Sequence, residues 1–281
     1  MRATMAIILA RGLGSRLRAD DGAALAPAQR EAAAKGAKGL MPIAGRPFLD
    51  YTLHEFAEAG VKDVVFVVAP DDDALRDRYD EQAPPNRLRV RYAVQDEPRG
   101  TAHALLAARD VILAAAGAPR CDDGHRHFLV ANADNLYPAT AIHDLLELHG
   151  PGVAAFDAES LVGDGLMERE RVRRFALLDI GADGGLRDVV EKPEASHPLM
   201  QRAPQWVSMN LWRFDDRILD DCAAVEPSSR GELELQDAVL RAIARGDRFQ
   251  AVEQRLAVPD LTHRRDIAVL EGTLAQRHPR P

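Results

Sequence analysis

Near its N-terminus the chain reads Ile7-Ile8-Leu9-Ala10-Arg11-Gly12-Leu13-Gly14-Ser15-Arg16-Leu17. An apolar run ends in two glycines, and an arginine follows the second glycine by two positions. Such a run predicts a buried strand, and the glycines let the backbone turn sharply where the strand ends. We expect the amide N–H groups of this loop to face a phosphate, with Arg16 adding a permanently charged, forked donor.

Two other interpretations of this loop stay open at this point. A dinucleotide-binding fold requires the pattern G-x-G-x-x-G, and Leu17 stands where the third glycine belongs, which weakens that interpretation. The loop is also compatible with a plain strand-to-helix turn that binds no ligand.

Composition narrows the class of protein. Of the 281 residues, 46% are apolar and 28% are charged, which is an ordinary globular balance. The 36 basic and 44 acidic residues give a net charge of −8, which argues against nucleic-acid and anionic-membrane partners. The two cysteines, Cys121 and Cys222, have no metal-like spacing. The apolar run Met5–Ala10 is too short for a signal peptide or a membrane span, so we expect a cytoplasmic protein.

Strand and helix patterns alternate through the first half of the chain. We expect strands at Ala6–Ala10, Asp63–Pro70, Leu88–Gln95 and His127–Ala131, and helices at Phe48–Ala59, Ala74–Asp80, Thr101–Ala115 and Thr140–His149. This alternation predicts an α/β fold with a mostly parallel sheet and helices on both faces. Ligands of such sheets bind at the carboxyl ends of the strands, where the glycine loop falls.

The second half predicts shorter strands, followed by helices. The expected strands are Val153–Asp157, Arg173–Ile180, Leu186–Glu191 and Gln205–Phe214, with a hairpin turn at Ala182-Asp183-Gly184-Gly185. The expected helices are Asp215–Val225, Glu232–Ala244 and Arg265–Arg277, and we expect the last four residues to be frayed. Because no linker interrupts the chain, we predict one domain over 1–281, whose pattern changes at about residue 150.

The segment Arg18–Lys38 is rich in alanine and charge and is broken by glycine and proline. Ala28–Lys35 predicts a short helix that offers little to bury. The segment is either a solvated insertion or a mobile flap over the phosphates, and the two interpretations are compatible.

Further motifs follow the glycine loop in the chain, and together with it they form an ordered series. In chain order they are Lys38-Gly39-Leu40-Met41-Pro42, Gln95 followed by Gly100-Thr101-Ala102-His103, Asn132-Ala133-Asp134, Val190-Glu191-Lys192-Pro193, Met209-Asn210-Leu211 and Pro259-Asp260-Leu261-Thr262. In this order and rough spacing the chain resembles the sugar-1-phosphate nucleotidylyltransferases, from about Met5 to about Ile267. The resemblance implies a Rossmann-like sheet of the nucleotide-diphospho-sugar transferase type, with a smaller sugar-binding part. It further implies that residues 1 to about 150 form a nucleotide-binding half, and that about 151–281 form the sugar-binding half and the C-terminal helices.

The resemblance also implies a reaction. A sugar 1-phosphate attacks the α-phosphate of a nucleoside triphosphate, pyrophosphate leaves, and Mg²⁺ is the cofactor. The pattern at Gln95 is most similar to relatives that take UTP or dTTP. We expect small-molecule substrates as the partners, and the sequence leaves a homo-oligomer open.

The family's functional residues carry over as follows. The resemblance implies that the triphosphate is bound by Leu9, Ala10, Gly12, Gly14 and Ser15, with Arg16 and Lys38 as catalytic cations. It implies that the nucleobase is bound by Gln95, Gly100 and Thr101, and the metal by Asp134 and Asp260. Lys192 would be the catalytic residue that binds the sugar phosphate, and Glu191 and Asn210 would bind the sugar. The family usually has Gly-Asp where this chain has Ala133-Asp134. His103 is interpreted as a positioning or packing residue.

Two alternatives remain from the sequence. One is a cytidylyl- or guanylyltransferase that acts on a heptose, a mannose or phosphocholine. The other is a non-catalytic, regulatory paralogue that binds nucleotide sugars, because Asp260 is followed by only a partial match to the family. A binding protein does not need both aspartates.

Overall fold

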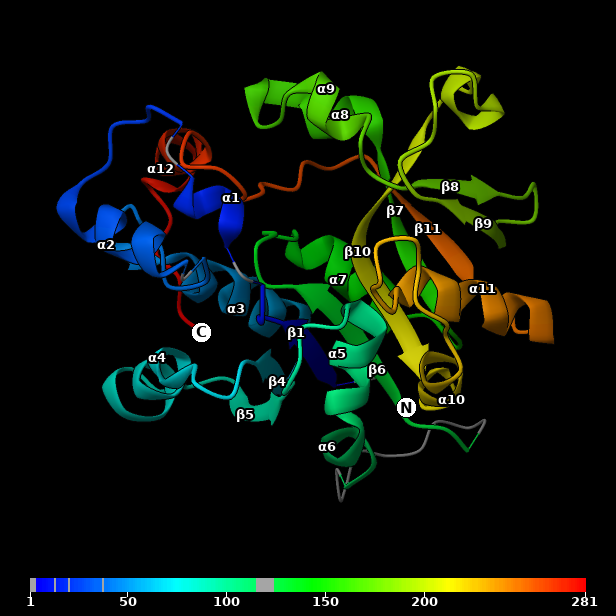
Figure 1. Ribbon diagram of the computed structural model, residues 1–281, viewed down its shortest axis with the longest axis horizontal. Coiled ribbons are helices and arrows are strands. Elements are labelled where there is room, and N and C mark those ends of the chain that lie inside the picture. The colour runs from blue at the N-terminus through cyan, green and yellow to red at the C-terminus, as the bar shows by residue number, and fades with distance from the viewer. Residues whose placement is uncertain (1–3, 13, 20, 37, 115–123) are drawn as a thin grey trace.

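The computed structural model describes residues 4–12, 14–19, 21–36, 38–114 and 124–281. Its centre is β1 (Met5–Leu9), which pairs in parallel with β4 (Asp63–Val68) on one side and with β6 (His127–Asn132) on the other. Beyond β4, β5 (Arg89–Val94) adds a further parallel strand. The carboxyl ends of these strands therefore meet at one edge of the sheet, where the glycine loop begins (Figure 1).

The sheet continues past β6 through a strand of opposite direction. β10 (Trp206–Asp215) pairs antiparallel with β6 and with β7 (Gly152–Asp157), and β11 (Gln250–Gln254) is parallel to β7. β8 (Leu177–Ile180) and β9 (Leu186–Val190) form the predicted hairpin, which joins the sheet at β10. The mixed, mostly parallel sheet agrees with the predicted fold class.

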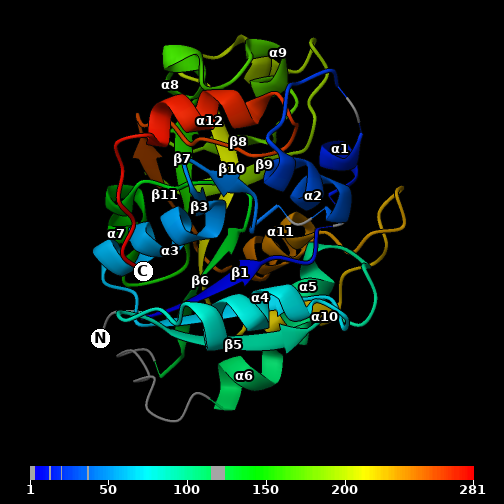
Figure 2. The ribbon, with the colours of Figure 1, turned by 90° about the vertical axis from the view of Figure 1, so that its left-hand side faces the viewer.

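Helices cover both faces of the sheet, on opposite sides in Figure 2. Successive strand residues point to opposite faces, so Ala6 and Ile8 belong to one core and Met5 and Ile7 to the other. The first core packs against α3 (Phe48–Ala59) and α7 (Ala139–Leu146). The second packs against α5 (Thr101–Ala107), α6 (Arg109–Ala114), α10 (Ile218–Ala223) and α11 (Leu235–Arg245).

A third core lies beneath the glycine loop. It joins α1 (Ser15–Arg18), α2 (Pro27–Lys35), the small hairpin of β2 (Pro42–Ile43) and β3 (Arg46–Pro47), and α12 (Asp266–Leu274). Figure 1 shows α12, near the C-terminus, beside α1 and α2, near the N-terminus. The helix expected at 28–35 forms and, as expected, has little to bury: within α2 the buried residues are Gln29, which bonds Glu271 of α12 at 2.8 Å, and Ala33.

Several element boundaries differ from those predicted. The helix expected at 101–115 breaks at Ala108, and its last position, like Cys121, lies outside the described residues. α4 (Asp73–Arg76) continues as a π-helix over Asp77–Gln82. The strand expected from Arg173 begins at Leu177, because α9 (Arg169–Val172) precedes it, and α8 (Ala158–Val162) was not predicted.

The last residues are not frayed. The backbone N–H of Asn86 donates to the carbonyl of Pro281 at 3.0 Å, and Arg277 pairs with the buried Glu55 of α3. These contacts hold the end of the described chain against α3 and the segment before β5.

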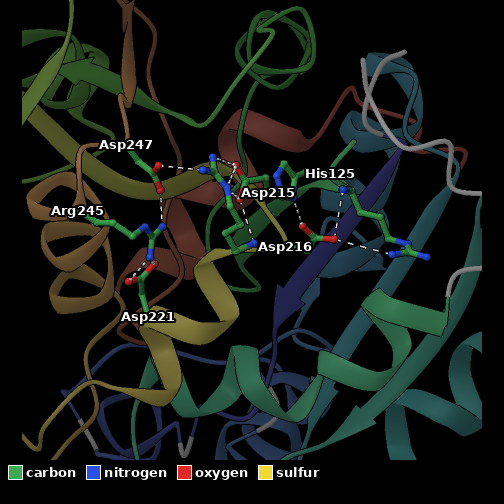
Figure 3. Close-up of polar contacts among 8 residues, drawn as sticks. His125, Asp215, Asp216, Asp221, Arg245 and Asp247 are labelled. Atoms are coloured by element: carbon green, nitrogen blue, oxygen red, sulfur yellow. Dashed lines mark hydrogen bonds and ion pairs between the residues drawn. The ribbon is translucent and has the colours of Figure 1, made fainter. Parts of the chain in front are cut away.

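A charged network lies at the opposite edge of the sheet from the glycine loop (Figure 3). Asp215, the last residue of β10, faces His127 at the start of β6, and its carboxylate accepts from Arg217 at 2.7 Å. Arg217 also reaches Asp247, which pairs with Arg245 of α11, and Arg245 in turn pairs with Asp221 of α10. The network therefore ties α10 and α11 to the end of β10, away from the ligand-binding edge.

None of the helices in the described part of the chain is both long and apolar enough to span a membrane.

Candidate active site

A cavity of about 780 Å³ opens at the carboxyl ends of β1, β4 and β6. Its walls come from the glycine loop, the end of the 18–38 segment, the start of α4, the start of α5 and the residues after β6. Eight of the predicted site residues line it: Leu9, Ala10, Gly12, Lys38, Gln95, Gly100, Thr101 and Asp134. The cavity thus joins the predicted nucleobase residues to the predicted phosphate and metal residues.

The other seven predicted residues lie outside the cavity lining. Gly14, Ser15 and Arg16 begin α1, Asp260 follows β11, and Glu191, Lys192 and Asn210 lie on the β9–β10 side of the molecule. The structure therefore brings eight of the predicted residues together around one cavity, whereas the predicted sugar residues lie outside its lining, on the second half of the sheet.

Gly14 is required by packing between two loops. Its φ is +61°, and a Cβ at this position would lie 2.5 Å from the carbonyl oxygen of Gly36, at the end of α2. The guanidinium of Arg18 bonds the neighbouring carbonyl of Lys35 at 2.9 Å. Arg18, Lys35 and Gly36 also line the cavity. The 18–38 segment is therefore packed on the glycine loop and forms part of the cavity wall.

Lys38 and Asp134 form an ion pair at the cavity wall. The Lys38 ammonium lies 2.7 Å from Oδ2 of Asp134, and the two side chains are 18% and 27% exposed. Asp134 follows β6 directly, as predicted, with Ala133 buried beside it. The pair places a cation and an anion at the point where the phosphates of a bound nucleotide are expected.

The second predicted metal ligand is held next to the first by the backbone. The N–H of Leu261 donates to the carbonyl of Asp134 at 2.9 Å, and the N–H of Leu136 donates to the carbonyl of Pro259 at 2.8 Å. Burial, followed by the negative charge of Asp134, raises the pKa of Asp260 to about 6. The charge of Asp134 therefore favours the protonated form of Asp260.

This donor set fits Mg²⁺. Within the described residues no group of three or more His, Cys, Asp or Glu side chains could hold a metal ion. Mg²⁺ is commonly held by one or two carboxylates, with substrate phosphates and water completing its octahedron. Asp134 and Asp260 would supply the two carboxylates, and a bound triphosphate the remaining ligands.

At the other end of the cavity, the side chain of Gln95 is fixed by two hydrogen bonds. Its amide nitrogen donates to the carbonyl of Gly100 and contacts Nδ1 of His103, both at 3.1 Å. Nδ1 of His103 is then the acceptor, which supports the interpretation of His103 as a positioning residue. Both amide hydrogens of Gln95 are engaged, and Oε1 has no hydrogen-bond partner in the described part of the chain.

Gly100 and Thr101 have contacts that the sequence did not indicate. Gly100 has φ +108°, and a Cβ there would lie 2.4 Å from the carbonyl oxygen of Leu233. The Thr101 hydroxyl accepts from the N–H of Leu235 at 2.9 Å. The segment before α11 is thus bonded to the start of α5, and this places Glu232 in the cavity wall.

Two of the predicted sugar-side residues have left-handed backbone conformations. Lys192 has φ 45° and Asn210 has φ 58°, values that non-glycine residues rarely adopt and that concentrate at functional sites. Asn210 lies where the register of β10 shifts between Ser208 and Trp212. Lys192 is half exposed and lies 3.8 Å from Glu191, so its ammonium is accessible to a ligand.

A family model described as nucleotidyl transferase matches residues 5–258. The chain belongs to the nucleotidyl transferase family. This confirms the resemblance stated from the motifs. A UTP–glucose-1-phosphate uridylyltransferase of Haloferax volcanii is 26% identical over 88% of this chain and 86% of its own length. A glucose-1-phosphate thymidylyltransferase of Neisseria gonorrhoeae is 26% identical over 71% of this chain and 62% of its own length.

Not all of these nucleotidyl transferases have the same length. The chain spans about half, 55%, of a low-salt glycan biosynthesis nucleotidyltransferase of Haloferax volcanii, to which it is 26% identical. A crystal structure of UDP-glucose pyrophosphorylase with UDP-glucose superposes with a TM-score of 0.70 over 98% of this chain and all of that one, at 18% identity. That likeness confirms the predicted fold of this nucleotidyl transferase.

Proposed function

We propose that this nucleotidyl transferase moves a nucleotidyl group from UTP or dTTP to a sugar 1-phosphate. A phosphate oxygen of the sugar 1-phosphate forms a bond to the α-phosphorus, the bond from that phosphorus to the bridging oxygen breaks, and pyrophosphate leaves. One observation carries the proposal: a single cavity joins the fixed amide of Gln95 to the Lys38–Asp134 pair. The relatives named for this reaction support the choice of substrates.

The nucleobase preference rests on the free oxygen of Gln95. Because both amide hydrogens are bonded inside the protein, the side chain presents an acceptor to the cavity. Uracil and thymine offer an N–H donor at ring position 3, whereas the same position of cytosine is an acceptor. The site is therefore suited to UTP and dTTP rather than CTP.

The phosphate chemistry is assigned to cations and backbone amides. Lys38 neutralises negative charge that develops at the phosphates, and the amides of Gly12, Gly14 and Ser15 with Arg16 bind the pyrophosphate end. Asp134 and Asp260 would hold Mg²⁺, which would supply charge neutralisation for the phosphates. On the other side, Lys192 binds the sugar phosphate. Glu191 accepts hydrogen bonds from sugar hydroxyls, and the amide of Asn210 hydrogen-bonds the sugar. No covalent enzyme intermediate is required.

The test is pyrophosphate release across a grid of nucleoside triphosphates and sugar 1-phosphates, with and without Mg²⁺. We expect release only when UTP or dTTP, a hexose 1-phosphate and Mg²⁺ are all present, and we expect Asp134→Asn to abolish it. Release that persists at the wild-type rate in Asp134→Asn contradicts the metal assignment. Release with CTP but not with UTP or dTTP contradicts the role of Gln95 as a hydrogen-bond acceptor for the base. A protein that binds nucleotide but releases no pyrophosphate with any pair favours the regulatory alternative.

A further inference from the structure

Asp260 already has a cation beside it. The guanidinium of Arg171, on α9, lies 2.7 Å from Oδ2 of Asp260, and the two side chains are 12% and 6% exposed. The other oxygen, Oδ1, accepts from the hydroxyl of Thr262 at 2.7 Å. Both oxygens of this proposed metal ligand are therefore engaged within the protein.

Arg171 has a second anion that is independent of Asp260. Its Nη1 donates to both carboxylate oxygens of Asp266, each at 3.0 Å. Asp266 is in turn fixed at the start of α12, where it accepts from the N–H groups of Thr262 and His263 at 2.8 and 2.7 Å. Figure 2 shows α9 directly above α12, which agrees with this contact. Arg171 can therefore release Asp260 and still remain paired.

Each of the two aspartates is paired with a cationic side chain, and the two cations lie in different places relative to the cavity. Lys38 pairs with Asp134 and lines the cavity, whereas Arg171 pairs with Asp260 from outside the cavity lining. A divalent cation bound to both carboxylates is repelled by each of these cations at short range. Lys38 is placed to turn toward phosphates in the cavity, whereas Arg171 can turn to Asp266, which it already bonds.

We propose that Arg171 is a positioning residue that occupies Asp260 in the metal-free protein and transfers fully to Asp266 when the divalent cation binds. This rests on the proposed function, which makes Asp260 a metal ligand. In the metal-free protein Arg171 neutralises a buried carboxylate that would otherwise face Asp134 unpaired. The metal must displace the Arg171 guanidinium from Asp260, so Arg171 lowers the affinity of the nucleotide-free protein for the metal.

The test measures Mn²⁺ binding to nucleotide-free protein by the loss of the free-ion electron paramagnetic resonance signal. The pH is set well above the pKa of about 6 of Asp260, so that protonation does not compete. In Arg171→Met we expect Mn²⁺ to bind about tenfold more tightly than in the wild type, because a nearby positive charge has been removed. The matched control is Arg169→Met, which removes an arginine from the same helix that pairs with the exposed Glu159, and we expect no change.

A merely structural role for Arg171 predicts the opposite change in Mn²⁺ affinity for Arg171→Met. If Arg171 served only to hold Asp260 in place, its loss would weaken Mn²⁺ binding, and weaker or unchanged binding in Arg171→Met overturns the proposal. Should Arg171→Met unfold, Arg171→Gln replaces it, because its neutral amide still bonds Asp260 and Asp266, and the same tighter binding is expected. In Asp266→Asn, Arg171 loses its second anion, so we expect weaker Mn²⁺ binding than in the wild type.

Asp134→Asn separates this inference from the proposed function. When that variant loses Mn²⁺ binding and Arg171→Met does not tighten it, the metal site stands and the inference fails. When the wild type and Asp134→Asn bind Mn²⁺ equally, the proposed metal site fails and the inference falls with it.

Discussion

The ammonium of Lys38 lies 2.7 Å from the carboxylate of Asp134, although the two residues are 96 positions apart. Lys38 ends the segment packed on the glycine loop, and Asp134 follows the neighbouring strand β6. The two side chains therefore meet in the cavity wall, where we expect the phosphates to bind. The contact also makes Lys38 the cation nearest to the first proposed metal ligand.

Lys38→Met is expected to lower the rate of pyrophosphate release by about 100-fold, because a charge-stabilising donor is lost from the phosphates. The measurement is steady-state pyrophosphate release with UTP or dTTP and glucose 1-phosphate. Lys62→Met, at an exposed lysine before β4, is the control and should retain the wild-type rate. A rate within twofold of the wild type in Lys38→Met would remove Lys38 from the catalytic set.

Lys192→Ala is expected to raise the KM for sugar 1-phosphate about tenfold, since an ionic bond to its phosphate is lost. The KM for the nucleotide should stay nearly constant, because Lys192 lies outside the nucleotide cavity. Initial rates with one substrate varied at a time give both values. A larger effect on the nucleotide than on the sugar phosphate would show that Lys192 is assigned to the wrong substrate.

His103→Ala is expected to raise the KM for UTP or dTTP by about tenfold, because the Gln95 amide loses one of its two partners. The KM for sugar phosphate should not change. His143→Ala removes a surface histidine of α7 and serves as the control. If His103→Ala leaves the nucleotide KM unchanged, the amide of Gln95 does not depend on His103.

Gly14→Ala is expected to lower the free energy of unfolding by about 1–3 kcal/mol. The added Cβ meets the Gly36 carbonyl oxygen at 2.5 Å, and φ of +61° strains any side chain. Denaturant unfolding measures this loss. Gly12→Ala provides the comparison, since a Cβ at Gly12 meets nothing within 4 Å. Equal stability of the two variants would mean that the contact between the two loops is not needed for folding.

Cys222 is expected to be unreactive toward thiol reagents in the folded protein. Burial, followed by the charge of Asp221, raises the pKa of Cys222 to about 12 from 9.0, so the thiol stays protonated in mildly alkaline solution. The measurement is the labelling rate of a Cys121→Ser variant as the pH is raised from 7 to 9, about the usual thiol range. We expect rapid labelling only after denaturation. Labelling of the native protein that increases across this range would contradict the burial of Cys222 in the second core.

The sequence predicted best the elements whose residues alone decide their structure. β1, β4 and β6 are continuous apolar runs that are buried on both faces, and α3 was predicted at its observed bounds, Phe48–Ala59. By contrast, β11 buries only Ala251 and Gln254, so its sequence carries little periodicity. Its conformation depends on pairing with β7, which is almost 100 residues earlier in the chain.

The candidate site likewise has features that depend on distant parts of the chain and could not be predicted from the local sequence. Gln95, Gly100, Thr101 and Asp134, which the sequence motifs singled out, line one cavity. The reasons for Gly14 and Gly100 were not visible, because each glycine accommodates a backbone carbonyl from a distant segment. Arg171 was missed as well, since it lies in a run of charged residues where nothing distinguishes it from a solvated side chain.

The position of β10 has a consequence for the order of assembly during synthesis. β10 lies between β6 and β7 in the sheet, yet it follows both in the chain. Until Trp206–Asp215 has left the ribosome, β6 presents an unpaired edge and β7 has no neighbour through which to join the sheet. An open strand edge on a nascent chain is prone to pairing with other chains. We therefore expect the first half of this protein to depend on the arrival of a single late strand, and chains that stop before it to aggregate.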